Sequence, residues 1–238
     1  MSVRTPVFVV CSPLERVGKT LIARLLAEFF ISDDRAVECF DLNSDRPSLS
    51  DYLPDRTDFA ALADTRAQMA LFDRLVLDDG AVRVVDLGRS AFEQFFTISA
   101  QIRFGEEARR RQVQVVVLFV ASPSPVAVRA YAALQRWLPG IVLVPVHNEV
   151  LGRLLARDKY PTSGGASLSL RVPILAPGLH RIAVHPAFSF VDFRAGKFKD
   201  ISMSYRIELD SWMKRVFVEF RELELRLLLA TLRLSLQH

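Results

Sequence analysis

Apolar runs rich in β-branched residues alternate with helix-compatible stretches along the chain, and this alternation limits the folds that it can adopt. The runs predict strands at Val7–Val10, Ala36–Leu42, Val82–Leu87, Val113–Val120 and Ile141–Val146. The stretches between them predict helices at Leu21–Ile31, Thr65–Leu77, Ala91–Phe104 and Pro125–Leu138. Strands that are apolar on both faces are typical of parallel sheets covered by helices on both sides. The pattern therefore predicts an α/β fold with a mostly parallel, doubly wound sheet flanked by helices.

Length and composition favour one domain without a strongly charged surface. The chain has 238 residues, of which 50% are hydrophobic, so it can bury one sizeable core. We expect a single domain over residues 1–238, with a core at residues 1–150 and a loop and helical extension at residues 151–238. The formal net charge of +4 is too small to indicate a nucleic-acid partner. Because the sequence has no N-terminal targeting pattern and no apolar run of about 18 residues, we expect a cytoplasmic location.

The segment after the first predicted strand has the form of a phosphate-binding loop. The sequence VGKT at residues 17–20 lies between that strand and the helix that begins at Leu21. In such a loop the backbone N–H groups face the phosphates, Lys19 neutralises the outer phosphates and the Thr20 hydroxyl binds magnesium. The complete pattern G-x-x-x-x-G-K-[ST] has glycine where this chain has Pro13. The position between strand and helix still favours a phosphate loop over an ordinary turn whose lysine points into solvent.

Carboxylates follow two further predicted strands. Asp41, Asn43 and Asp45 come at the end of the second strand, and Asp86 comes near the end of the third. Ligands of open α/β sheets bind outside the carboxyl ends of the strands, so these side chains face the crevice that holds the phosphate loop. Asp41 and Asp86 are therefore candidate magnesium ligands. An alternative for Asp86 is that it caps the helix starting near Ser90.

Asn148 ends the fifth predicted strand. Its side-chain amide offers both a donor and an acceptor, so it can pair with the edge of an adenine base. It can equally stabilise the turn that follows the strand. Both interpretations remain open from the sequence.

The four segments occur in a fixed order: VGKT at residues 17–20, FDLNSD at 40–45, VVDLG at 84–88 and VHN at 146–148. In this order the chain resembles the ParA/MinD group of P-loop ATPases, which has a deviant Walker A loop and includes MipZ, and also the related dethiobiotin synthetase branch. The resemblance implies ATP and Mg²⁺ as cofactors. The residues implied in ATP binding are Arg16, Val17, Gly18, Lys19, Thr20, Leu21 and Asn148.

The same resemblance implies a reaction and a mode of assembly. Lys19, Asp41, Asn43 and Asp45 take the positions associated with ATP hydrolysis, and Thr20, Asp41 and Asp86 those associated with the metal. For the ParA/MinD group it also implies a nucleotide-dependent dimer that binds DNA, a membrane or a protein partner.

The phosphate loop departs from the ParA/MinD pattern KGGxGK[ST]. Leu14 stands at the signature lysine, and Glu15 and Arg16 replace the two glycines, so the loop is a degenerate one. In the family that lysine reaches the nucleotide of the partner subunit; Arg16 is either a substitute positive charge or a solvated loop residue. Asn43 stands where a carboxylate helps to position the attacking water. We therefore expect weak or partner-stimulated hydrolysis, with Asp45 as a nearby carboxylate.

The C-terminal segment from Met203 predicts one or two helices. One helical stripe has a spacing of four and three residues, and it contains Val216, Phe220, Leu223, Leu227, Ala230 and Leu234. The alternatives for this stripe are packing on its own domain, a homodimer or protein partner, or a membrane surface. Membrane and non-specific DNA binding have no specific support, because the short basic run Arg109–Arg111 has no interleaved aromatic residues.

Three functions are compatible with these features. The first is a ParA/MinD-like ATP-binding switch that acts in positioning, partitioning or partner binding. The second is an ATP-dependent ligase of the dethiobiotin synthetase type, for which the sequence offers no convincing set of residues to bind an organic substrate. The third is a degenerate, non-hydrolysing interaction protein, which Pro13, Leu14 and Asn43 favour.

Overall fold

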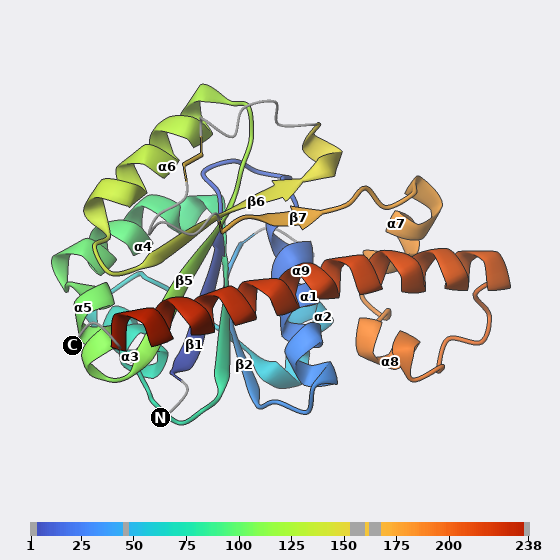
Figure 1. The fold of residues 1–238 in the computed structure, drawn as a ribbon, viewed down its shortest axis with the longest axis horizontal. Helices are drawn as coiled ribbons and strands as arrows, with labels where there is room; N and C mark the ends of the chain where they lie inside the picture. Colours follow the sequence, from blue (N-terminus) through green and yellow to red (C-terminus); the bar gives the residue numbers. More distant parts are fainter. Residues whose placement is uncertain (1–3, 45–47, 153–159, 162–167, 236–238) are drawn as a thin grey trace.

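The computed structural model describes residues 4–44, 48–152, 160–161 and 168–235. Its seven-stranded sheet has the order β3-β2-β4-β1-β5-β6-β7, and neighbouring strands pair in parallel (Figure 1). The strands are β1 Thr5–Cys11, β2 Val37–Leu42, β3 Thr57–Phe59, β4 Val82–Leu87, β5 Val113–Val120, β6 Val142–Asn148 and β7 Leu170–Val172. The predicted fold class is therefore confirmed.

Helices cover both faces of the sheet and divide the core into two layers. On one face α1 (Lys19–Ser32) shares a hydrophobic cluster with α7 (Pro177–Ala183), α8 (Phe190–Arg194) and α9 (Met203–Ser235). On the other face lie α3 (Thr65–Leu75), α4 (Arg89–Gln101), α5 (Phe104–Arg110) and α6 (Pro125–Trp137). Two short elements, α2 (Leu49–Tyr52) and η1 (Pro54–Arg56), connect β2 to β3, and η2 (Glu149–Leu151) follows β6.

Side chains of β1 alternate between the two layers, as a strand requires. Phe8 and Val10 belong to the cluster around α1, whereas Val7, Val9 and Cys11 belong to the cluster around α3 to α6. This alternation explains the near-continuous apolar sequence of the strand, because both of its faces are buried.

The five predicted strands and most of the predicted helices are present. The helix predicted at residues 91–104 is wrong at its end. The helix α4 stops at Gln101, Arg103 adopts a left-handed φ of 51°, and α5 begins at Phe104. In the short basic run, Arg109 and Arg110 form the last turn of α5. Much of the loop that we expected after residue 150, at residues 153–159 and 162–167, lies outside the described residues.

The sheet order places the candidate site at a topological switch point. The chain leaves β1 through α1 toward β2 on one side, whereas it leaves β4 through α4 and α5 toward β5 on the other side. Because β1 and β4 are neighbours in the sheet, these opposed connections open a crevice at their carboxyl ends. The loop between β1 and α1 and the end of β4 both border this crevice.

The C-terminal segment forms one helix of 33 residues, α9, which runs across the α1 layer in Figure 1. The predicted stripe is buried at Val216, Phe220, Leu223 and Leu227. By contrast, Leu225, Leu228 and Leu229 are exposed. None of the described helices is both long and apolar enough to span a bilayer.

A buried ion pair joins the C-terminal segment to α1. The Arg24 Nε donates to Glu28 Oε1 at 2.8 Å, and both side chains are 1% exposed. Arg24 also donates to the Ala183 carbonyl at 2.7 Å and to the Phe188 carbonyl. The second Glu28 carboxylate oxygen accepts from the Ser189 hydroxyl at 2.7 Å. Both charged groups are therefore hydrogen-bonded to each other and to a segment about 160 residues away in sequence, which compensates for their burial.

Replacing Glu28 by alanine is expected to destabilise the protein strongly. The change leaves the Arg24 guanidinium buried without its counter-charge, which typically costs about 3–5 kcal/mol of the free energy of unfolding. Urea denaturation of the wild type and the variant measures this difference.

The matched control is Glu222→Ala, which breaks an i,i+4 pair with Arg226 on the exposed side of α9. An exposed helical pair contributes about 0.5 kcal/mol or less. Equal losses of stability in Glu28→Ala and Glu222→Ala would contradict the assigned role of the buried pair.

Candidate functional site

The loop between β1 and α1 closes tightly against the end of β6. Gly18 has a φ of 91°, which is the left-handed region that favours glycine. A Cβ at Gly18 would lie 2.6 Å from the Asn148 Nδ2. That same nitrogen donates to the Val17 carbonyl at 3.0 Å. Glycine is therefore required here both by the backbone conformation and by the approach of Asn148.

Lys19 begins α1 and lies against its own loop rather than in solvent. Its side chain is 6% exposed, and its Nζ donates to the Leu14 carbonyl at 2.6 Å. An ordinary turn with a solvated lysine does not fit this geometry. The ammonium group instead lies inside the curve of the loop, beside the first turn of α1, where the backbone N–H groups create a site for anions.

Thr20, Asn43 and Asp86 meet at the carboxyl ends of β1, β2 and β4. The Thr20 hydroxyl donates to Asp86 Oδ2 at 2.7 Å. The Asn43 Nδ2 donates to Thr20 Oγ1 at 3.1 Å and lies 3.4 Å from Asp86 Oδ2. Asp86 does not cap α4, because the N-cap of that helix is Gly88 and it has no side-chain cap.

The other carboxylate oxygen of Asp86 is buried and has no hydrogen-bond partner among the described residues. Burial raises the pKa of Asp86 from 3.8 to about 6, and the hydrogen bond from Thr20 only partly opposes this. The nearby Asp41 carboxylate raises the pKa further, whereas Asn43 and Lys19 lower it. The site therefore contains a desolvated carboxylate whose pKa is raised chiefly by burial.

Asp41 organises the segment after β2. Its Oδ1 accepts from the Asn43 backbone N–H at 2.9 Å, and its Oδ2 accepts from the Ser50 backbone N–H at 3.0 Å. Both oxygens thus hold the backbone that leads from β2 to α2. Asp45, the additional carboxylate predicted from the sequence, lies outside the described residues.

A cavity of about 540 Å³ adjoins the loop between β1 and α1. Of the predicted nucleotide-binding residues, its lining includes Arg16, Gly18, Thr20, Leu21 and Asn148. The rest of the wall is mainly apolar and comes from β7, the segment after it, α7 and α9, including Val172, Pro173, Leu175, Ala183 and Trp212. The Trp212 Nε1 donates to the Pro173 carbonyl at 2.8 Å, which fixes this wall.

Sequence reasoning missed these C-terminal wall residues, and also Arg24 and Tyr52, which line the same cavity. Arg24 left a signal, because an arginine and a glutamate four residues apart interrupt the otherwise apolar face of α1. The residues of β7 left none, because a three-residue strand is too short for a periodic pattern.

Asn148 uses its amide within the protein. In addition to the bond with Val17, its Oδ1 accepts from the Val150 backbone N–H at 3.3 Å. This geometry matches the turn-stabilising interpretation. Contact with an adenine edge stays a prediction, supported by the position of Asn148 in the cavity wall.

The outer part of the loop carries the residues that depart from the glycine-rich pattern. Arg16 has a left-handed φ of 54° and is exposed at the wall of the cavity. Glu15 forms an exposed ion pair with Arg89 at 2.7 Å, which connects the loop to the start of α4. The side chains that replace the two glycines therefore face solvent.

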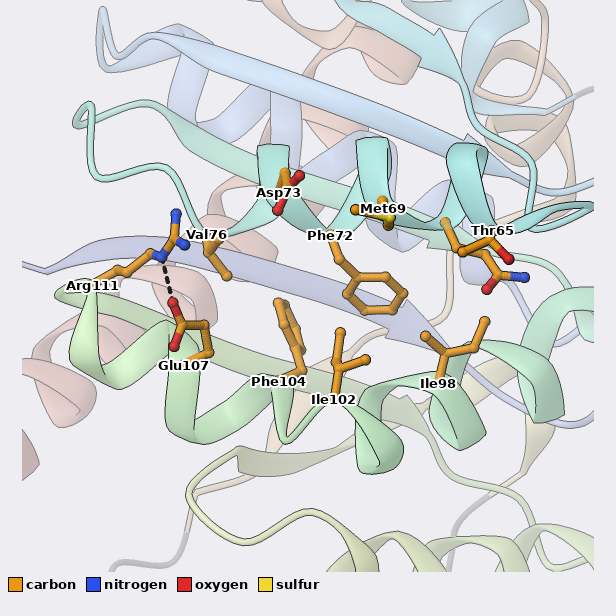
Figure 2. Close-up of a pocket in the computed structure, with 11 residues that line it drawn as sticks. Thr65, Met69, Phe72, Asp73, Val76, Ile98, Ile102, Phe104, Glu107 and Arg111 are labelled. Carbon is orange, nitrogen blue, oxygen red and sulfur yellow. Dashed lines mark hydrogen bonds and ion pairs between the residues drawn. The ribbon is translucent and has the colours of Figure 1, made fainter.

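A second hollow, of about 410 Å³, lies between α3 and the α4–α5 pair (Figure 2). Phe72 and Phe104 form its apolar floor with ring centroids 5.1 Å apart, and Glu107 and Arg111 pair at one end. Its walls come from helices that cover the opposite face of the sheet from α1, and its lining includes no residue of the loop between β1 and α1. It is therefore separate from the candidate site.

Comparison with known proteins does not assign a family to the chain. No protein-family model matches the chain, and no curated protein matches its sequence. The structure is similar to the crystal structure of a ParA family ATPase from Chlorobium tepidum TLS, with 15% identity and a TM-score of 0.49, over 89% of this chain and 98% of that chain. It is also similar to a nucleotide-binding protein from Archaeoglobus fulgidus in complex with ADP, with 13% identity and a TM-score of 0.47, over 74% of this chain and 84% of that chain. At these identities and TM-scores the similarities carry no functional argument, so the function has to be inferred from the geometry of the site.

Proposed function

We propose that this chain binds ATP with Mg²⁺ and acts as a nucleotide-dependent switch. The observation that carries the proposal is the contact between Thr20 and Asp86 beside the unpartnered Asp86 oxygen, at the start of α1. A buried carboxylate oxygen without a donor is costly unless a ligand satisfies it. A cation bound there, together with phosphates at the helix N-terminus, would satisfy it.

The residues at this position fit magnesium. Thr20 offers a hydroxyl oxygen and Asp86 a carboxylate. Asp41 would act on the metal indirectly, because its carboxylate accepts from the backbone N–H of Asn43 and so positions that residue. No group of three or more acidic, histidine or cysteine side chains suited to a metal occurs among the described residues. Magnesium is usually held by only one or two protein carboxylates together with phosphate oxygens and waters, so this sparse set suits it. When bound, the ion would neutralise charge on the phosphates.

The cavity beside the loop suits a nucleoside. Its size, about 540 Å³, and its mainly apolar wall are typical of sites that enclose a flat organic ring. The loop provides the phosphate end, and Asn148, Leu21 and Pro173 lie in the wall where the base would bind. We propose ATP as the ligand because an amide such as Asn148 can pair with adenine.

The same site argues for slow hydrolysis. The Asn43 amide donates its hydrogen bonds toward Thr20 and Asp86, and an amide cannot accept a proton from water as a carboxylate does. We therefore propose weak or partner-stimulated hydrolysis, with Lys19 placed at the phosphates. The exposed leucines of α9 are the proposed surface for a homodimer or a protein partner.

Phosphate release distinguishes the switch from its alternatives. Slow release that a protein partner accelerates supports the switch, whereas release that requires a small carboxylic acid supports the ligase. Nucleotide binding without release under any condition supports the non-hydrolysing form, which the Asn43 geometry also favours.

Replacing Lys19 by alanine is expected to weaken ATP binding about 10- to 100-fold, since a hydrogen bond to a charged group contributes roughly 1.5–3 kcal/mol. Isothermal titration calorimetry with Mg²⁺ and ATP measures the two affinities. The control is Lys214→Ala, which removes an exposed lysine paired with Asp210 on α9. Absence of heat with the wild type, or equal affinities for wild type and Lys19→Ala, would contradict the proposal.

Replacing Asp86 by asparagine is expected to change how stability depends on pH in metal-free protein. Because the pKa of Asp86 is raised from 3.8 to about 6 in the folded state, the folded state binds this proton more tightly than the unfolded state. The protonated carboxyl therefore stabilises the folded state fully below pH 4, and this stabilisation is lost as the pH rises through about 6. At about 1.4 kcal/mol per pKa unit, the loss in the free energy of unfolding is roughly 3 kcal/mol. Asp86→Asn removes this loss.

Urea denaturation in EDTA between pH 4 and pH 7 measures the effect as the difference between wild type and variant. Asp55→Asn, a change at an exposed aspartate, controls for net charge. Parallel pH profiles for the wild type and Asp86→Asn would show that the carboxylate is not perturbed.

A further inference from the structure

Tyr52 connects the loop after β2 to the C-terminal segment. It is the last residue of α2, the helix whose Ser50 N–H donates to Asp41. The Tyr52 hydroxyl donates to the Val184 carbonyl at 2.9 Å, across 132 residues of sequence. A single short helix therefore contacts the candidate metal site at one end and the segment after α7 at the other.

Arg24 contacts the same segment from α1. It lies one helical turn after Thr20, and its guanidinium donates to the carbonyls of Ala183 and Phe188. The guanidinium carbon also lies 4.4 Å from the centre of the Tyr52 ring. Arg24 and Tyr52 thus pack against each other, and both donate hydrogen bonds to backbone carbonyls within residues 183–188.

Glu28 extends this contact to α8. Besides Ser189, it accepts from the Val191 backbone N–H at 2.8 Å. The Arg24 guanidinium carbon lies 4.6 Å from the centre of the Phe190 ring. The Phe190 ring also packs against Trp212 of α9, with ring centroids 6.2 Å apart. We name residues 183–191 the docking segment, because polar contacts to α1 and α2 hold it in place.

The cavity beside the phosphate loop reaches the docking segment. Its lining includes Gly18 and Thr20 of the loop, and it also includes residues that hold or belong to the docking segment, namely Arg24, Tyr52, Ala183 and Val184. A ligand that fills the cavity therefore touches both the phosphate loop and the contacts that hold the docking segment. A ligand shifts an equilibrium only through contacts that differ between the two states, so a coupling requires that the ligand touch the contacts that hold the docking segment.

We propose that Tyr52 and Arg24 couple nucleotide binding to the position of the docking segment, so that nucleotide tightens the contact of residues 183–191 with α1. The coupling rests on the proposed function, because it requires that a nucleotide occupy the cavity. In this proposal Tyr52 is a positioning residue, because its hydroxyl holds the docking segment and touches neither the phosphates nor the metal. Trp212 gives the docking segment a direct contact with α9, so the surface of α9 is the site at which a partner would sense the change.

Hydrogen–deuterium exchange of the full chain tests the coupling. The ligand is Mg²⁺ with AMP-PNP, added at concentrations that calorimetry shows to saturate each protein. In the wild type, nucleotide is expected to slow exchange in peptides covering residues 183–191 by about five-fold or more, the lower end of typical allosteric coupling. In Tyr52→Phe, which keeps the ring over Arg24 and loses only the hydroxyl, the effect should fall below about two-fold.

Tyr131→Phe is the matched control. The Tyr131 hydroxyl also donates to a backbone carbonyl at 2.9 Å, that of Pro161, but it lies in the layer on the opposite face of the sheet. This variant should keep the full nucleotide effect on residues 183–191. A merely structural role for Tyr52 would raise exchange equally with and without nucleotide.

The outcomes separate the coupling from the proposed function. Nucleotide binding without slower exchange at residues 183–191 in the wild type overturns the coupling and leaves nucleotide binding intact. An undiminished effect in Tyr52→Phe also overturns it. Absence of nucleotide binding by calorimetry overturns the proposed function and, with it, the coupling.

Discussion

The position of β1 between β4 and β5 is the constraint on which the site depends. Parallel pairing brings Val10 of β1 opposite Asp86 of β4, so the loop that leaves β1 must pass the Asp86 carboxylate. The helix that follows then places Thr20 within hydrogen-bond distance of it. The adjacent β2–β4 pairing sets Asp41 opposite Asp86 and brings Asn43 to the same point. The register of three strands, rather than any one motif, therefore creates the constellation.

This convergence has an energetic cost that the protein does not relieve by itself. Two carboxylates lie at the ends of neighbouring buried strands, and the Nζ of Lys19, a cation close enough to lower the pKa of Asp86, donates to the Leu14 carbonyl. Asp41 accepts hydrogen bonds from backbone N–H groups, whereas one Asp86 oxygen has no partner in the part of the chain that the structure describes, and burial raises the pKa of Asp86. Uncompensated burial of this kind is typical of binding sites, where the ligand supplies the missing partner.

Sequence patterns were sufficient for the parts of the fold that repeat locally. The apolar runs of β1, β4 and β5 are long enough to identify buried strands. Because ligands of open α/β sheets bind outside the carboxyl ends of the strands, the sequence also predicts that Thr20 and Asp86 face the same crevice, and the two side chains are hydrogen-bonded. Tyr52 could not be found in this way, because its partner Val184 is distant in sequence and contributes a backbone carbonyl, which has no residue-specific signal. The end of α4 was also missed, since only the left-handed backbone of Arg103 separates it from α5.

The departures from the glycine-rich loop separate two parts of its chemistry. The inner residues, Gly18 to Thr20, make the contacts with Asn148, Leu14 and Asp86, and these contacts need only the residues that the chain retains. Of the outer residues, Glu15 pairs with Arg89 in solvent and Arg16 is exposed. Replacing glycine at those two positions therefore leaves the proposed phosphate and magnesium contacts in place. What these two side chains alter is the surface that a second subunit or a partner would meet, so we expect them to change partner chemistry rather than to abolish the proposed nucleotide binding.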